Sequence, residues 1–334
     1  MAKKQAQKQR QFDWMTYSKP ARILTDAQEE SLSAGLLQPL LSAIIADPSM
    51  RLDIRARSAN LYYRGSSLLR LTGEPMVAEF EPAGGGALER VSLTTPSDVE
   101  ALLGRTVDAR DAVDRHLTAG EAPARRAVLL AVADANGGGD LFASEYVVVD
   151  LEYTYGKRRY DLIAIKRTEG VTGPGGFSNP RLAFVDVRCR EQGLGGANSL
   201  EAVGGDLADF TKAVGGSHLE RAKLELAELI AQKVRLGLLP QELDMRALDH
   251  GLPELLVAFV GYEKLVERDS DSAIIALHER LSSRHFPTEH RLRFVDLPPA
   301  VADKAKGPDA ELMIRCDDLM TYRQLKEYRL RGRQ

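Results

Sequence analysis

The chain has 334 residues, of which 44% are hydrophobic and 28% charged, and its formal net charge is −3. This is an ordinary globular composition, and the two cysteines exclude a disulfide framework or a cysteine-ligated zinc site. The apolar runs are too short to span a bilayer, and the basic N-terminus has no apolar segment of the secretory kind. We therefore expect a cytoplasmic protein that does not associate with a membrane.

The first part of the chain, residues 1–120, is expected to mix helices with a β-meander. Residues 1–20 predict a basic arm, and the spacing of leucine and isoleucine over 26–47 predicts a helix. Residues 50–73 alternate with period two and break at Arg64-Gly65-Ser66, which is typical of a hairpin. A strand over 75–82 and a helix over 97–118 are predicted to follow.

The second part, residues 121–334, has a different plan. A helix over 121–139 ends at a glycine run, and it precedes two strands within 144–167 and a third from 181. The remaining predicted elements are helices within 199–236, a strand over 253–262, a helix over 270–284, a strand over 290–298 and a short C-terminal helix. This order predicts an α/β (α+β) fold with a mixed central sheet flanked by helices, in which a helical crossover follows a three-stranded meander.

Charged residues interrupt the apolar pattern where the strands of the meander begin or end. Asp150 and Glu152 lie two apart at the end of "YVVVDLEY", and Asp161 begins "DLIAI" directly after the turn. Asp186 and Arg188 end the third strand, "AFVDVR". Hairpin geometry brings Glu152 close to Asp161, and pairing of the next strand brings Asp186 to the same place. Carboxylates that converge in this way require a cation, and oxygen ligands suit Mg²⁺ or Mn²⁺.

A metal ion at this site has a direct chemical use. It would bind a scissile phosphate, lower the pKa of a bound water and stabilise developing charge, which is the chemistry of phosphodiester hydrolysis. We therefore expect Asp161 and Asp186 to bind the metal, and Glu152 to act as an auxiliary ligand or general base. Arg188, on the same face as Asp186, is expected to contact the phosphate.

The sequence "DLEYTYG…RRYDLIAI…AFVDVR" between two helices resembles the PD-(D/E)XK nuclease superfamily, over roughly 121–262. The resemblance implies a restriction-endonuclease-like core in which Asp161 and Asp186 match the two motif acids. Glu152 corresponds to an acid on the first strand, and Glu121 and Gln192 are weaker matches to helix positions. It also implies a nucleic-acid substrate, DNA rather than RNA, and a role such as bacterial defence against foreign DNA.

Arg188 occupies the position at which that motif has lysine. Arginine keeps the positive charge but cannot act as a general base, because it does not deprotonate. Two other interpretations therefore stay open. One is a catalytically inactive binding or scaffold subunit of a larger complex, and the other is simple cross-strand salt bridging on an exposed sheet face.

Basic residues elsewhere are candidate nucleic-acid contacts. They lie on the predicted N-terminal hairpin and in the turn between the first two strands of the meander, at Arg55, Arg57, Arg64, Lys157 and Arg158. An exposed polar face of a half-buried sheet also explains the hairpin arginines, and the sequence favours that interpretation. The N-terminal part would then grip substrate, a partner protein or a second copy of the chain. A different class, nucleotide binding, is indicated by "QGLGGANS" at 192–199, which follows a strand and precedes a helix.

Overall fold

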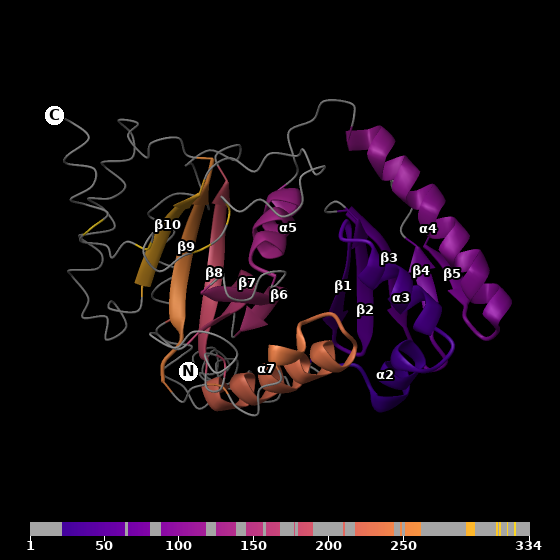
Figure 1. Cartoon of the computed structure of the whole chain (residues 1–334), viewed down its shortest axis with the longest axis horizontal. Helices are drawn as coiled ribbons and strands as arrows, with labels where there is room; N and C mark the ends of the chain where they lie inside the picture. Colours follow the sequence, from indigo (N-terminus) through magenta and orange to yellow (C-terminus); the bar gives the residue numbers. More distant parts are fainter. Residues whose placement is uncertain are drawn as a thin grey trace, which may run out of the picture.

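The computed structural model covers the whole chain, drawn in Figure 1. The residues that it describes are 22–63, 66–80, 88–117, 125–137, 145–155, 158–167, 177, 180–189, 210, 218–243, 248, 251–261, 292–297, 312, 314, 319 and 324. Within this part of the chain, no helix is long and apolar enough to cross a membrane.

The N-terminal region contains a five-stranded antiparallel sheet in the order β1-β2-β3-β4-β5. Helices α2 and α3 precede the sheet, and the long helix α4 follows it (Figure 1). The bounds are α2 (Asp26–Ser33), α3 (Gln38–Ala46), β1 (Met50–Arg55), β2 (Ser58–Tyr63), β3 (Ser66–Thr72), β4 (Val77–Phe80), β5 (Glu89–Ser92) and α4 (Pro96–Leu117).

Local chemistry explains where these elements begin and end. Thr25 and Gln28 form a capping box that satisfies backbone N–H groups at the start of α2. The single helix predicted over 26–47 is two helices, because the chain turns at Gly35, where a Cβ would lie 2.9 Å from the Cα of Ser31. The helix over 97–118 and the break after Tyr63 are confirmed. The stretch before that break, expected to be a single strand, is two antiparallel strands, β1 and β2, joined by a turn at Ala56 and Arg57, and β5 was not predicted.

The second sheet has the order β10-β9-β8-β7-β6 and carries the predicted meander. Strands β6, β7 and β8 pair antiparallel, whereas β8, β9 and β10 pair parallel. The elements are α5 (Arg125–Ala135), β6 (Tyr146–Tyr155), β7 (Arg158–Lys166), β8 (Arg181–Cys189), α7 (His218–Arg235), the 3₁₀ helix η5 (Gln241–Leu243), β9 (Glu254–Val260) and β10 (Leu292–Leu297). The mixed sheet and its helical crossover are therefore confirmed, while the helix predicted over 270–284 lies outside the described residues.

Helices cover both faces of this sheet. Leucines of α5 belong to one hydrophobic cluster, with Val148 and Val185, and leucines of α7 belong to the other, with Val149 and Phe184. All seven residues of β9 are buried, as expected for a parallel strand between two layers. The α7 cluster also contains residues of α2, α3 and the first sheet, so the two sheets share one continuous core. In Figure 1, α7 extends from the second sheet toward the first.

Candidate active site at a fork in the second sheet

Strands β7 and β8 stop pairing in the middle of the sheet. Their paired residues end at Leu162 and Val185. Beyond this point β7 continues beside β6, through the pair Tyr160–Tyr153, while β8 continues beside β9, through the pair Asp186–Val257. The sheet therefore opens into a fork, which we define as residues 158–161 of β7 and 186–189 of β8.

The two predicted metal ligands, Asp161 and Asp186, lie at the base of this fork. Continuing the register of Leu162 and Val185 by one residue places Asp161 opposite Asp186. Oδ2 of Asp161 accepts a hydrogen bond of 2.8 Å from the backbone N–H of Val187, the residue directly after Asp186. Both aspartates are buried, at 3% and 6% exposure. The structure therefore brings these two predicted site residues together.

Arg188 joins this group through Asp186. One guanidinium nitrogen of Arg188 lies 2.5 Å from Oδ2 of Asp186, and Arg188 is only 5% exposed. The two residues alternate along β8 with Val187, so both project from the same face of the strand. Because the pair is buried, removing either member would leave the charge of the other in a desolvated site.

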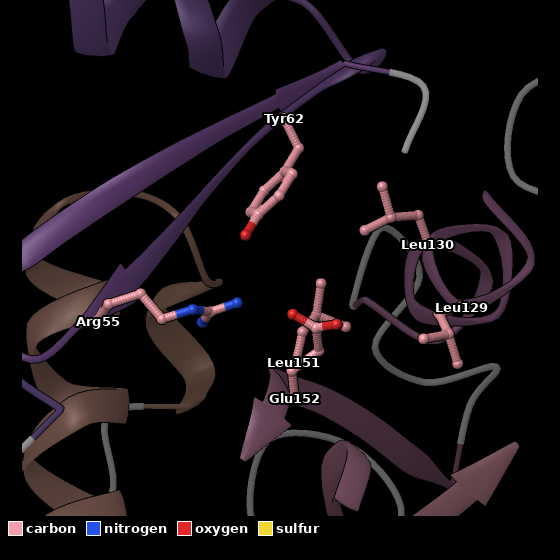
Figure 2. A pocket seen from close by; sticks show the side chains of 6 residues that line it. All are labelled: Arg55, Tyr62, Leu129, Leu130, Leu151 and Glu152. Atoms are coloured by element: carbon pink, nitrogen blue, oxygen red, sulfur yellow. The ribbon is translucent and has the colours of Figure 1, made fainter. Parts of the chain in front are cut away.

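Glu152 is held by other partners. Its φ of 51° is left-handed, which is uncommon for a residue with a side chain, and its Oε1 lies 2.6 Å from Nη2 of Arg159. Glu152 also lines a small cavity with Arg55, Tyr62 and leucines of α5 and β6, shown in Figure 2. Among the residues that the structure describes, no three acidic, histidine or cysteine side chains form a group that could hold a metal ion. The predicted convergence of Glu152 with Asp161 and Asp186 is thus not seen as a three-ligand cluster.

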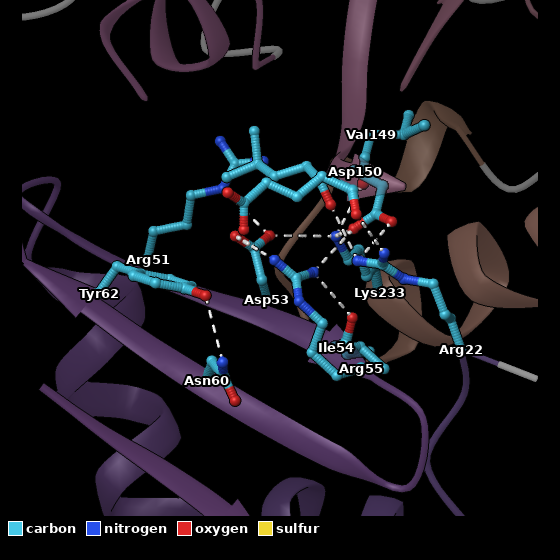
Figure 3. Close-up of polar contacts among 12 residues, drawn as sticks. Arg22, Arg51, Asp53, Ile54, Arg55, Asn60, Tyr62, Val149, Asp150 and Lys233 are labelled. Atoms are coloured by element: carbon cyan, nitrogen blue, oxygen red, sulfur yellow. Dashed lines mark hydrogen bonds and ion pairs between the residues drawn. The ribbon is translucent and has the colours of Figure 1, made fainter. Parts of the chain in front are cut away.

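A buried group of charges lies between the two sheets, and most of it was not predicted. Asp53 of β1 and Asp150 of β6 are both fully buried, and Nζ of Lys233 from α7 lies between them, at 3.4 Å and 3.3 Å from their carboxylates (Figure 3). Two arginines of β1 and one from the segment before α2 complete it. We call this set the inter-sheet charge cluster: Arg22, Arg51, Asp53, Arg55, Asp150 and Lys233.

Burial and ion pairing act in opposite directions on this cluster. Burial of Asp53 disfavours its charged form, but Arg51, Lys233 and Arg55 together hold its pKa below the usual value. For Lys233, burial dominates over the two carboxylates and lowers the pKa. Each of these charges is stable only while its partners stay in place.

Asp150 and Arg55 therefore have structural partners that the sequence did not indicate. Asp150 was predicted to lie with the strand-end acids, but it binds Lys233, Arg22 and Arg55. Arg55 was predicted as a nucleic-acid contact on a hairpin, but its side chain is 17% exposed and lies 3.4 Å from Asp150. The guanidinium group of Arg55 is occupied by its ion pair with a buried carboxylate, so it is not placed to bind a phosphate.

The other predicted basic contacts divide into two kinds. Arg57 is exposed in the turn between β1 and β2, where its φ is 51°. Arg158 begins β7, but its side chain lies outside the described residues, as do Arg64, Lys157, Glu121, Gln192 and the loop 192–199. Of the two members whose side chains the structure describes, Arg55 and Arg57, only Arg57 is exposed.

For two members of the charge cluster, the sequence alone could have indicated a buried charge. Lys233 falls three residues after Ile230 and seven after Leu226, on the apolar face of an amphipathic helix. Asp53 sits between Leu52 and Ile54, two buried apolar residues of β1. A lysine and an aspartate at such positions need each other when buried, although neither position identifies its partner.

No protein-family model, curated protein or solved structure matches this chain.

Proposed function

We propose that this chain is a metal-dependent nuclease of the restriction-endonuclease-like kind, which hydrolyses phosphodiester bonds in DNA. The observation that carries the proposal is the pair Asp161 and Asp186, side by side at the base of the fork with Arg188 next to them. The order α5, β6, β7, β8, α7 and β9 supports it. A helix, a three-stranded meander, a helix and a further strand also make up the core of the PD-(D/E)XK superfamily.

The donor set at the fork fits a hard divalent cation. Mg²⁺ in phosphoryl-transfer sites commonly uses one or two carboxylates, with water and substrate phosphate completing the shell. Asp161 and Asp186 would hold such an ion, so a three-carboxylate cluster is not required. When bound, Mg²⁺ or Mn²⁺ supplies an acidified water and neutralises charge on the scissile phosphate.

The protein side chains have separate tasks in this proposal. The hydrogen bond from Val187 N–H fixes the orientation of the Asp161 carboxylate. Arg188 would leave Asp186 and donate to a non-bridging phosphate oxygen, as guanidinium groups do in phosphate sites. Since arginine stays protonated, the water must lose its proton to another group. Our proposed proton acceptor is Glu152, which lies between Leu151 and Tyr153, the β6 partners of Leu162 and Tyr160 on either side of Asp161.

One observation favours a second candidate, a binding or scaffold subunit that has the fold without activity. Arg188 and Asp186 neutralise each other in a nearly buried ion pair, which is a stable resting arrangement. If that pair never opens, Asp186 cannot serve a metal ion. The protein would then bind nucleic acid or a partner protein without cutting.

A cleavage assay separates the two candidates. The wild-type protein is incubated with plasmid, single-stranded DNA and RNA, each with Mg²⁺, Mn²⁺ or a chelator. Asp161→Asn and Asp186→Asn test the site, and Asp108→Asn, an exposed carboxylate on α4, is the matched control. The proposal expects metal-dependent DNA cleavage by the wild type and the control, and none by the two site variants. Cleavage by the site variants at the wild-type rate would refute the assignment. Absence of cleavage with retained DNA binding would favour the scaffold function.

A further inference from the structure

Arg22 contacts four consecutive residues of β6. Its Nη2 lies 2.9 Å from Oδ2 of Asp150 and donates to the carbonyl of Leu151 at 2.9 Å. Its Nη1 donates to the carbonyl of Glu152, also at 2.9 Å. The guanidinium carbon lies 5.4 Å from the ring centroid of Tyr153, within the range of a cation–π contact. One side chain from outside the sheet thus holds the whole segment 150–153.

Lys233 of α7 contacts the same segment and also the preceding residue, Val149. Its Nζ donates to the carbonyl of Val149 at 2.8 Å and lies 3.3 Å from Oδ1 of Asp150. Lys233 and Arg22 therefore meet at the same carboxylate, from two different elements. Figure 3 shows both cations directed at Asp150. Together they contact every residue from 149 to 153.

This segment of β6 is irregular and needs such support. The register between β6 and β7 shifts between Val148 and Asp150, so Val149 is an extra residue in the ladder. Three residues later Glu152 adopts its left-handed φ of 51°. Conformations of this kind persist only when the surrounding structure determines them, and they gather at functional sites. Here the contacts of Arg22 and Lys233 hold this irregular backbone in place.

The irregular segment is also the ladder partner of the fork. Leu151 pairs with Leu162 and Tyr153 pairs with Tyr160, so the pairs on both sides of Asp161 depend on β6. On the other side of Asp161 the pairing with β8 has already ended. The backbone position of Asp161 is therefore set mainly from β6. A shift of segment 149–153 would move Asp161 relative to Asp186.

We propose that Arg22 and Lys233 are positioning residues, which hold segment 149–153 and so set Asp161 opposite Asp186. The catalytic consequence of this inference rests on the proposed nuclease function, whereas its structural consequence does not. It also gives the N-terminal residues a role at the fork, because Arg22 precedes the first sheet and yet contacts the second.

The experiment compares Arg22→Ala and Arg22→Lys with a matched control, Arg235→Ala. Arg235 lies two residues after Lys233 on α7 and bridges to Glu29 of α2 at 2.6 Å, so it also connects the two parts of the chain. It is half exposed, and its ion-pair partners are Glu29 of α2 and Glu228 of α7. Both parts of the experiment use the full-length protein.

The first measurement is steady-state cleavage of DNA. A displacement of about 1 Å at a catalytic group costs on the order of 100-fold in rate, so we expect Arg22→Ala to lower kcat about 10- to 100-fold with KM unchanged. Arg22→Lys keeps the charge but cannot donate to two carbonyls in a planar fork, so its kcat should also fall while its melting temperature stays near that of the wild type. Added guanidinium ion, below denaturing concentration, should restore Arg22→Ala. Equal kcat values for both Arg22 variants and Arg235→Ala would overturn the inference.

The second measurement is amide hydrogen exchange, which separates this inference from the nuclease proposal. Arg22→Ala should accelerate exchange of β6 and of residues 160–163 in β7, whereas Arg235→Ala should leave both unchanged. This result stands even if the wild type cleaves no substrate, in which case only the nuclease proposal fails. Unchanged hydrogen exchange at residues 160–163 in Arg22→Ala would show that Arg22 does not position Asp161.

Discussion

The carboxylate of Asp161 on β7 accepts a hydrogen bond of 2.8 Å from the backbone N–H of Val187 on β8, just beyond Leu162 and Val185, the last pair of the ladder between these strands. A side chain has here replaced the backbone carbonyl that would normally accept this hydrogen bond. The replacement allows the strands to separate without leaving a buried N–H unsatisfied. It also fixes a carboxylate directly beside Asp186, which is what a metal ion between the two strands would require.

The Asp161 side chain should therefore matter for both stability and activity, and two substitutions separate these roles. Asp161→Ala leaves the buried N–H of Val187 without its acceptor and should destabilise the fold by about 1–3 kcal/mol in urea unfolding. Asp161→Asn keeps an oxygen acceptor for this N–H, so its loss of unfolding free energy should be clearly smaller. Both variants should lose metal-dependent cleavage. Equal unfolding free energies for the two variants would contradict the role assigned to this hydrogen bond.

Replacing Arg188 tests whether it serves as a phosphate contact. Removing one preorganised donor to the transition state commonly costs about 100- to 1000-fold in kcat, so Arg188→Met should lose that much DNA cleavage. Arg188→Lys restores the residue type of the motif and should retain most of the activity, since the ammonium group also binds phosphate. Arg188→Met further leaves Asp186 without its partner. The double variant Arg188→Met/Asp186→Asn should therefore be more stable than Arg188→Met alone, and equal stability would argue against the buried pair.

The order of the elements in the second sheet could be predicted because each strand is an apolar run bounded by turn residues. The apolar runs also drew attention to Asp161 and Asp186, since a carboxylate directly beside such a run is conspicuous. Neither lies at a strand end as predicted, because β7 already begins at Arg158 and β8 continues to Cys189. The position of Glu152 could not be predicted in the same way. Strict alternation would place it with Asp161, but the extra residue at Val149 and the left-handed φ of Glu152 change the local geometry. Nothing in the letters "VVVDLEY" indicates a bulge.

The inter-sheet charge cluster was missed for a related reason. Its members come from four separate places in the chain, at 22, 51–55, 150 and 233, and the packing of α7 against both sheets brings them together. Arg55 illustrates the effect, because an arginine at the end of a strand usually lies in solvent. Its actual partner, Asp150, belongs to the other sheet. Sequence patterns describe the faces of single elements, whereas a buried ion pair is a property of two elements.

Lys233 should be essential to the interface between the two sheets. Lys233→Met leaves Asp53 and Asp150 buried beside each other with one shared cation removed, and breaking a buried pair in this way costs about 3–5 kcal/mol. Urea unfolding at neutral pH measures the loss. Lys233→Met/Asp150→Asn should recover part of it, because one unpaired charge is removed. Arg235→Ala, on the same helix but half exposed, should change stability by less than about 1 kcal/mol. A similar loss in Lys233→Met and Arg235→Ala would contradict the buried network.

Asp53 should make the stability of the protein depend on pH in the acid range. Burial of Asp53 raises its pKa, but Arg51, Lys233 and Arg55 outweigh burial, so the folded-state pKa lies below the unfolded value of about 3.9. A depressed folded pKa contributes stability that is fully present above the unfolded pKa and is lost as pH falls through the folded one. The urea midpoint of the wild type should therefore decline below about pH 4. Asp53→Asn should start from a lower stability at neutral pH and show a shallower decline, whereas Asp108→Asn should follow the wild type. An equal slope in Asp53→Asn and the wild type would show that Asp53 does not carry this dependence.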